Sequence, residues 1–398
     1  MVVEKRTFFA KFLICAYLIL KPFYLLDAPF QISDIILIIL FVYLACVRYV
    51  NYIVPSKAKI GFQYYVCFMV WAILINMAWY LYLAINQAEM ADSRFFTSAV
   101  YYIFNGIAML VILWLYELLG RRLIQIFVYG NFASCMSTVL YSLITIKRED
   151  WSSRQVAGFQ NPNQLAYYAV VIMAVAVLWG GYILTKMQVL LMLAGALYLN
   201  MISMSKAGIL AGMVMILLCW LYRFGNRRIF CTRLKASIVL GGIGIASALL
   251  LLIITGHGSS ILTMAGNLWA RILNMRNEND SNLGNGRGYN RVFEMGANFL
   301  WGMGEGAYER FQIMNGNEIH STIVSIYVSY GLIGLFLWGI AVLKLLLQEK
   351  YILYSFLCFS GIFLYWLTHN GVRNTIVWMV FMLIAISGYH SMKEGKNE

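Results

Sequence analysis

The sequence has few charged residues and almost no proline. Charged side chains make up 12% of the 398 residues, against 62% hydrophobic side chains, whereas a soluble domain carries about a quarter charged residues. Many apolar runs reach the roughly 20 residues that a helix needs to cross a bilayer. Since only 4 prolines interrupt the chain, we expect long, mostly unbroken helices. The composition predicts an all-α polytopic membrane protein.

Several patterns that carry chemistry in other proteins are also missing. The sequence has no CxxC pair, and all seven cysteines fall in or beside apolar runs, which disfavours disulfides and a zinc site. It has no Walker A motif, no HExxH and no DxD-type carboxylate pair, so an enzyme that uses a metal and a nucleotide sugar is disfavoured. We expect no cofactor and no metal. A donor that already carries its leaving group and arrives from the bilayer is favoured.

The net charge of +13 does not indicate a nucleic-acid partner. The basic residues lie between apolar runs, where Lys and Arg set membrane orientation and contact anionic lipids. We therefore expect membrane lipids, and no nucleic acid, as partners.

The apolar runs predict about twelve membrane-spanning helices. They lie near residues 8–26, 34–50, 61–85, 97–118, 123–146, 163–185, 187–204, 207–223, 236–256, 319–346, 351–368 and 374–390. A long polar loop separates the ninth span from the tenth. This divides the chain into residues 1–256 with nine spans, the loop 257–318, and residues 319–398 with three spans and a short tail.

The distribution of Lys and Arg predicts the orientation. With the N-terminus in the cytoplasm, cytoplasmic ends and loops hold 17 of these residues and the short outer loops hold 7. Cytoplasmic loops carry the excess of positive charge in membrane proteins. We therefore expect both termini to be cytoplasmic, the loop 257–318 to be extracytoplasmic, and the protein to lie in the cell inner (cytoplasmic) membrane.

The stretch from Gly286 to Gly334 is the first candidate for chemistry. A polar, glycine-rich loop ends there at His320, where an apolar helix is predicted to begin. Offsets of 7, 11 and 14 residues would put Tyr327, Gly331 and Gly334 on the same helix face as His320. A histidine near its usual pKa can accept a hydroxyl proton at neutral pH. The simpler alternative is an interfacial histidine that caps the helix.

The opening of the same stretch contains Arg287 and Arg291. They are four residues apart and would share a face of an α-helix, where an anion between them would offset their repulsion; two solvated arginines are the alternative.

The glycines of WGMGEGAYERF resemble a nucleotide-binding loop only superficially, because no strand precedes them. We expect them to allow tight backbone packing, and we assign no role to Arg310.

Two shorter motifs precede this stretch. In RQVAGFQNPNQLA (154–166), Asn161 and Pro162 predict a turn, and Asn163 is the expected N-cap of the next helix. Arg154 could bind a phosphate or carboxylate with its planar fork, or remain solvated. In SMSKAG (203–208), Lys206 could face the same anion or reach the membrane surface by snorkelling.

With these residues in hand, the chain resembles the O-antigen polymerase and O-antigen ligase family of bacterial polysaccharide-assembly proteins. The resemblance rests on RQVAGFQNPNQLA, on SMSKAG, and on the run from Gly286-Arg287 through GMGEGAYERF to HSTIVSIYVSYGLIGL, and it covers roughly residues 150–340. The order, spacing and predicted topology of the motifs carry it together. The N-terminal third is similar to the family only in hydropathy.

The resemblance implies a C-type glycosyltransferase fold with about twelve membrane helices and a large outer loop between helices nine and ten. It implies metal-independent transfer of a glycan from an undecaprenyl-diphosphate carrier, with a chain-length regulator and a flippase as further partners. Residues at matching positions would bind the diphosphate: Arg154, Lys206, Arg287 and Arg291. The family usually has arginine at the position of Lys206, and lysine cannot form the bidentate fork.

These observations leave four functions open. The first is a polymerase that adds a lipid-linked glycan to a new repeat unit, with His320 and Arg287 as catalytic residues. Further substrate-binding candidates are Asn161, Asn163 and Tyr327. The second is a ligase that moves the finished glycan to lipid A core or another acceptor. The third is a transporter of lipid-linked glycan, and the fourth is a structural membrane partner without activity.

Overall fold

The computed structural model describes residues 2–26, 31–47, 50–146, 153–225, 286–312, 318–347 and 352–387, and the single positions 263, 266, 267 and 270. These residues contain helices and connections, and no strand. The helices are α1 (Val2–Leu20), α2 (Ile32–Cys46), α3 (Ser56–Asn86), α4 (Arg94–Leu119), α5 (Arg122–Thr145), α6 (Pro162–Val175), α7 (Gly181–Ile183), α8 (Lys186–Ser203), α9 (Lys206–Gly225), α12 (Thr322–Leu346), α13 (Ile352–Thr368) and α14 (Thr375–Ser387). A π-helical segment, Ala176–Gly180, joins α6 to α7, and short 3-10 helices cover Ala88–Met90, Tyr289–Glu294, Gly296–Phe299 and Tyr308–Arg310.

The predicted all-α class is confirmed for the described residues. Every predicted span coincides with a helix except the one at 236–256, which lies outside the described residues. Six of the described helices are long and apolar enough to cross a membrane, and the other apolar helices are shorter. The chain is therefore a helical protein with the features of a membrane protein, while the number of about twelve spans stays a prediction.

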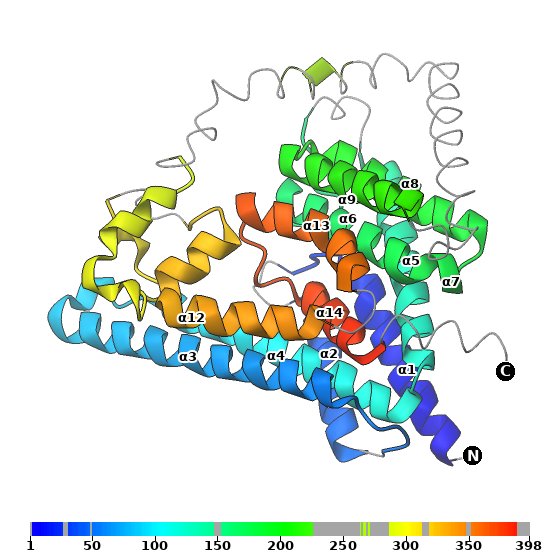
Figure 1. Ribbon diagram of the computed structural model, residues 1–398, viewed down its shortest axis with the longest axis horizontal. Coiled ribbons are helices and arrows are strands. Elements are labelled where there is room, and N and C mark those ends of the chain that lie inside the picture. Colours follow the sequence, from blue (N-terminus) through cyan, green and yellow to red (C-terminus); the bar gives the residue numbers. More distant parts are fainter. Residues whose placement is uncertain are drawn as a thin grey trace.

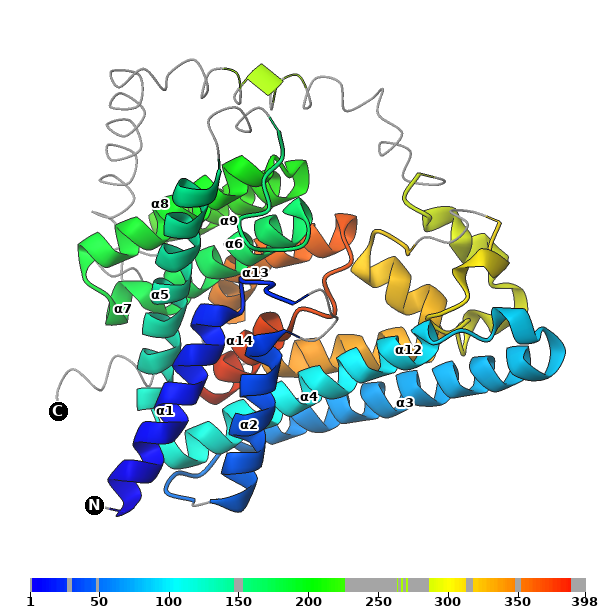
Figure 2. The same cartoon turned by 180° about the vertical axis from the view of Figure 1, so that it is seen from behind.

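The helices form two groups joined by a third. The long helices α3, α4 and α12 run side by side, and α14 packs against them. Helices α6, α8, α9 and α13 form the second group, and α1, α2 and α5 connect the two (Figures 1 and 2). Buried apolar side chains from both groups belong to one continuous core.

The connections predicted to lie outside the membrane contact one another. The amide of Tyr24, after α1, donates to the carbonyl of Gly158, before α6, at 2.8 Å. Asp92, before α4, accepts a hydrogen bond from the amide of Ala307 in the long loop at 2.7 Å. These connections therefore share one side of the helical bundle, as the predicted topology requires.

The connections predicted to be cytoplasmic also meet. The amides of Asn51 and Tyr52, before α3, both donate to the carbonyl of Glu117 at the end of α4, at 2.9 and 3.0 Å. Successive connections thus lie on opposite sides of the helical bundle, which is consistent with the topology predicted from the Lys and Arg distribution. Which side faces the cytoplasm stays a prediction.

Helix α12 differs from the prediction at its start and in its middle. It begins at Thr322, with Ser321 as the N-cap that accepts from the amide of Val324, so His320 precedes the helix. Gly331 has φ 69° and ψ −170°, which interrupts the helix. The prediction that His320 shares a helix face with Tyr327, Gly331 and Gly334 is wrong, because that face requires a continuous helix from His320 onward.

The glycine-rich turn of the long loop fills this break in α12. The amides of Met303 and Gly304 donate to the carbonyls of Val328 and Ser329, both at 2.8 Å. These carbonyls would otherwise lack partners at the interruption. A Cβ on Gly302 would lie 2.3 Å from the Ser329 oxygen. The predicted tight backbone packing of the glycines is confirmed.

Candidate functional site

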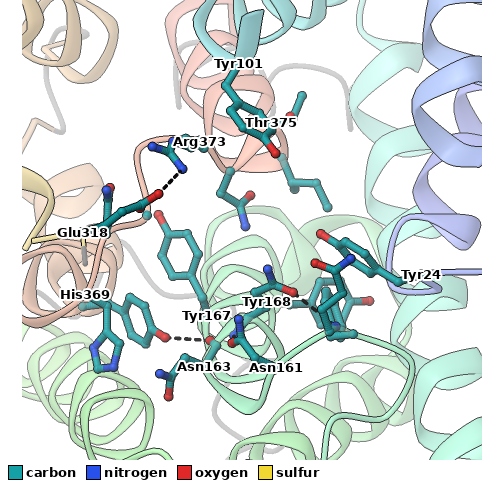
Figure 3. Close-up of a pocket in the computed structure, with 18 of the residues that line it drawn as sticks. Tyr24, Tyr101, Asn161, Asn163, Tyr167, Tyr168, Glu318, His369, Arg373 and Thr375 are labelled. Atoms are coloured by element: carbon teal, nitrogen blue, oxygen red, sulfur yellow. Dashed lines mark hydrogen bonds and ion pairs between the residues drawn. The ribbon is translucent and has the colours of Figure 1, made fainter. Parts of the chain in front are cut away.

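A cavity of about 500 Å³ opens where the connections on the predicted outer side meet. Its wall comes from the α1–α2 connection, the first turns of α4 and α6, the end of the long loop, and the α13–α14 connection. In Figure 3, His369 and Tyr24 lie on opposite sides, and Asn161 and Asn163 lie between them. Arg373 and Tyr101 occupy the other edge of the view.

Carboxamides and tyrosines dominate the wall. The carboxamides are Gln160, Asn161, Asn163, Gln164, Asn370 and Asn374, and the tyrosines are Tyr24, Tyr101, Tyr167, Tyr168 and Tyr365. A carboxamide offers two donors and an acceptor, and a tyrosine combines a ring with a hydroxyl. This wall suits a ligand that carries many hydroxyl groups over a partly apolar frame.

The start of α6 holds one side of the cavity in place. Asn161 is the N-cap, because its side chain accepts from the amide of Gln164 at 2.9 Å, and Pro162 is the first helical residue. The prediction that Asn163 caps the helix is wrong; Pro162 fits the first helical position, where no amide donor is needed. Asn163 instead accepts from the Arg154 guanidinium at 2.6 Å.

Arg154 connects the α6 start to the end of α8. Besides its bond to Asn163, its Nε donates to the carbonyl of Ser203 at 3.1 Å. Lys206 begins α9 three positions further on, but it is not part of the described cavity wall. Arg154 does not line the cavity either, but it contacts the lining residue Asn163.

His369, directly after α13, is the residue around which the predicted basic residues gather. Burial lowers the pKa of His369 to about 3. Three nearby charges act in the same direction: those of Arg287, His320 and Arg154. The ring stacks on Tyr365 with the centroids 4.7 Å apart. His369 is therefore neutral at physiological pH and too weak a base to accept a hydroxyl proton.

Arg287 and His320 lie together on the long-loop side of His369. The amide of His320 donates to the carbonyl of Arg287 at 3.2 Å. Arg287 Nη1 donates to the carbonyl of Thr368 at 2.6 Å, so its charge lies at the C-terminal end of α13, where a cation is favourable. His320 lines the cavity and is exposed. It remains the described histidine that is placed to act as a base.

Arg291 and Tyr327 do not join this group. Arg291 lies in the 3-10 helix Tyr289–Glu294 and Arg287 precedes this helix, so the two do not share an α-helical face. It is 1% exposed, and its guanidinium lies over the ring of Phe311 at 4.5 Å. Tyr327 packs against the same small apolar cluster, which includes Tyr308 and Phe311. Neither residue lines the cavity. Their positions support packing of the loop.

Three ion pairs in the cavity region were not predicted from the sequence. Lys21 Nζ lies 2.6 Å from Asp34 Oδ1 in the α1–α2 connection. Arg373 pairs with the buried Glu305 and, through Nη1 at 3.0 Å, with Glu318. Burial opposes the charge of Arg373, but the two carboxylates outweigh it and raise its pKa.

Glu305 fixes the long loop to three helices. Its carboxylate accepts from the hydroxyls of Tyr102 on α4 and Tyr330 on α12, at 2.9 and 2.7 Å. Its amide donates to Asn76 Oδ1 on α3 at 2.8 Å. The loop end that carries the cavity residues is thereby held against the first helix group.

Arg310, to which the sequence assigned no role, supports the glycine-rich turn. Its Nη2 donates to the carbonyls of Met303 and Gly304, and its guanidinium lies 4.7 Å from the Trp79 ring centroid. Burial lowers the pKa of Arg310 to about 10. A lysine has one donor group in place of the planar fork, so the substitution would weaken this turn.

The sequence contains signals that could have found the missed residues. Residues 369–374 read HNGVRN, a short polar run between two apolar spans, and this run supplies His369, Asn370 and Arg373. Glu305 is an acidic residue flanked by glycines in a turn that was expected to pack tightly. A charge in such a turn needs a partner, because an unpaired buried charge is costly.

Comparison with known proteins does not identify the chain. No protein-family model matches the sequence, and no curated protein matches it. The described residues also contain no group of three or more His, Cys, Asp and Glu side chains that could hold a metal ion.

Proposed function

We propose that the chain is a membrane glycosyltransferase of the polysaccharide-polymerase type. It would transfer a glycan from an undecaprenyl-diphosphate carrier onto a lipid-linked repeat unit at the outer face of the cytoplasmic membrane. The cavity carries this proposal, because a wall of carboxamides and tyrosines suits sugar hydroxyls. Arg287 and Arg154 do not line the cavity, but they lie near His369, which does, and their charges suit a diphosphate at that end. The resemblance of the motifs to the O-antigen polymerase and ligase family adds to the proposal.

The arrangement supports a simple displacement. The acceptor hydroxyl attacks the anomeric carbon of the donor sugar, and the bond from that carbon to the diphosphate oxygen breaks. His320 takes the hydroxyl proton. Arg287 and Arg154 stabilise the charge that develops on the diphosphate, and fixed charges of this kind supply much of the catalysis in many enzymes. Diphosphate is a good leaving group, so a general acid is not required.

Deletion of the gene tests the proposal and separates it from its alternatives. The polymerase reaction predicts that the surface glycan shrinks to one repeat unit on lipid A core. Long chains left on the lipid carrier would instead indicate a ligase. Loss of all intermediates from the outer face would indicate a transporter, and an unchanged glycan would contradict all three.

Two substitutions of His320 test the residue assigned as base. His320→Ala should reduce the rate by about 10²–10⁴-fold, the usual effect of losing a general base, and leave single repeat units. His320→Gln keeps a hydrogen-bonding side chain but cannot take up the proton, so it should fail equally. Both proteins should reach wild-type levels in the membrane, because His320 is exposed. Near-normal chains from the Gln variant would assign His320 to orientation of the acceptor.

A further inference from the structure

The charged residues in the cavity wall affect which glycans, neutral or acidic, the cavity can bind. The described wall contains two Lys or Arg side chains, Lys21 and Arg373. Each is paired with carboxylate: Lys21 with Asp34, and Arg373 with both Glu305 and Glu318. The half of the cavity that contains Lys21 and Arg373 therefore has no excess positive charge to attract an anion.

The geometry around Arg373 disfavours the approach of a third carboxylate. Glu305 is 1% exposed and occupies the inner side of the guanidinium. The side chain of Glu318 is 43% exposed and occupies the side toward the open cavity. The Nε of Arg373 is buried and out of reach. A sugar carboxylate that approached Arg373 would first meet the negative charge of Glu318.

The same region offers neutral hydrogen-bonding groups. Asn370 lines the cavity, and its Nδ2 donates to Ser325 Oγ at 3.4 Å. Asn374 and Gln164 add further carboxamides to the wall.

We propose that this half of the cavity selects uncharged sugars, and that Glu318 is the residue that excludes acidic ones. The proposal rests on the proposed function, since it names the class of sugar that the same cavity holds. The diphosphate end lies near His369, Arg287 and Arg154, and the uncharged sugar lies toward Arg373 and Lys21. The substrate class is therefore a glycan of hexoses and N-acetylhexosamines on a lipid diphosphate, rather than a uronic-acid glycan.

Saturation-transfer NMR with matched sugars tests the selection directly. The full-length protein is placed in nanodiscs of zwitterionic lipid at pH 7.5. The probes are methyl glycosides of glucose, galactose, mannose and the two common N-acetylhexosamines, each hexoside paired with its uronide. We expect transfer to at least one neutral hexoside and about fivefold weaker binding of its uronide, the upper end of what one half-exposed like charge produces.

Two glutamate variants isolate the role of Glu318. Glu318→Gln removes the charge at constant size and should bring the binding of uronide and hexoside within about twofold of each other. Glu309→Gln is the matched control, because Glu309 pairs with Arg94 away from the cavity and its side chain is 50% exposed. This control should keep the preference of about fivefold.

The remaining outcomes contradict the charge selection, the polymerase function, or both. Equal binding of uronides to the wild type, or an unchanged ratio in Glu318→Gln, contradicts the charge selection and leaves the deletion assay for chain elongation unaffected. Transfer to none of the glycosides contradicts both the selection and the assignment of the cavity to sugar. Neutral binding together with normal glycan length after gene deletion would leave a sugar site and remove the polymerase function.

Discussion

Glu305→Gln should loosen the long loop and destabilise the protein. The carboxylate of Glu305 is 1% exposed and pairs with Arg373, and it accepts hydrogen bonds from Tyr102 and Tyr330. Glutamine has nearly the same shape but no charge. Both tyrosines donate to Oε2 and Arg373 pairs with Oε1, so an amide oxygen that keeps the tyrosines turns the NH₂ group toward the guanidinium, and the contact with Arg373 is lost.

The magnitude follows from the pairing. Removal of one partner from a buried ion pair costs about 3–5 kcal/mol, because the other charge is left buried. Here Glu318 still faces Arg373 at 3.0 Å, so part of the compensation remains. We expect a loss of about 2–3 kcal/mol, which corresponds to a fall in Tm of roughly 2–4 °C for a chain of this length.

Thermal unfolding in detergent, together with hydrogen exchange of peptides that cover residues 300–312, measures both effects. Faster exchange in these peptides is expected for Glu305→Gln. The control is Glu309→Gln, where an exposed ion pair contributes less than about 1 kcal/mol, so Tm should change by about 1 °C or less. Equal shifts in the two variants would refute the view that Glu305 anchors the loop.

Four further results are expected. Gly302→Ala should prevent stable folding, measured as loss of a monodisperse peak on size exclusion, since its Cβ would lie 2.3 Å from the Ser329 oxygen. Arg310→Lys should lower the free energy of unfolding by about 1–2 kcal/mol, measured by thermal unfolding, because the contacts with the two carbonyls are lost. The pKa of His369 is about 3 in the folded chain against 6.5 ordinarily, so unfolded chains bind the extra proton and stability is lost as pH falls below 6.5; relative to His369→Gln, the wild type should lose about 2 kcal/mol between pH 7.5 and pH 5. Activity on lipid-linked substrate should survive EDTA; loss that magnesium or manganese restores would reveal a metal site.

The positions of the helices could be predicted because hydrophobicity is a local property of the sequence. An apolar run must satisfy its own backbone hydrogen bonds in a membrane, so it becomes a helix wherever it occurs. The start of α6 at Pro162 and the end of α4 at Leu119 lie within a residue or two of the predicted bounds. The tight glycine packing was also predictable, because no other role fitted those glycines.

The pairing of residues distant in the chain could not be predicted in this way. Glu305 and Arg373 are 68 positions apart, and no period or motif connects them. The break at Gly331 depends on the docked backbone of the long loop, which an isolated helical pattern does not contain. Arg287 and His320 are candidates that the motifs indicate, but their common neighbour His369 becomes a candidate only because the end of α13 places it near both.

Reconstitution with the native substrate tests the central claim most directly. The gene-deletion strain should accumulate single lipid-linked repeat units, and these can be extracted and added to purified protein in liposomes. The account predicts a ladder of longer glycans on the lipid carrier from the wild type and single units from His320→Ala. Single units from the wild type under the same conditions, or an equal ladder from both proteins, would contradict it.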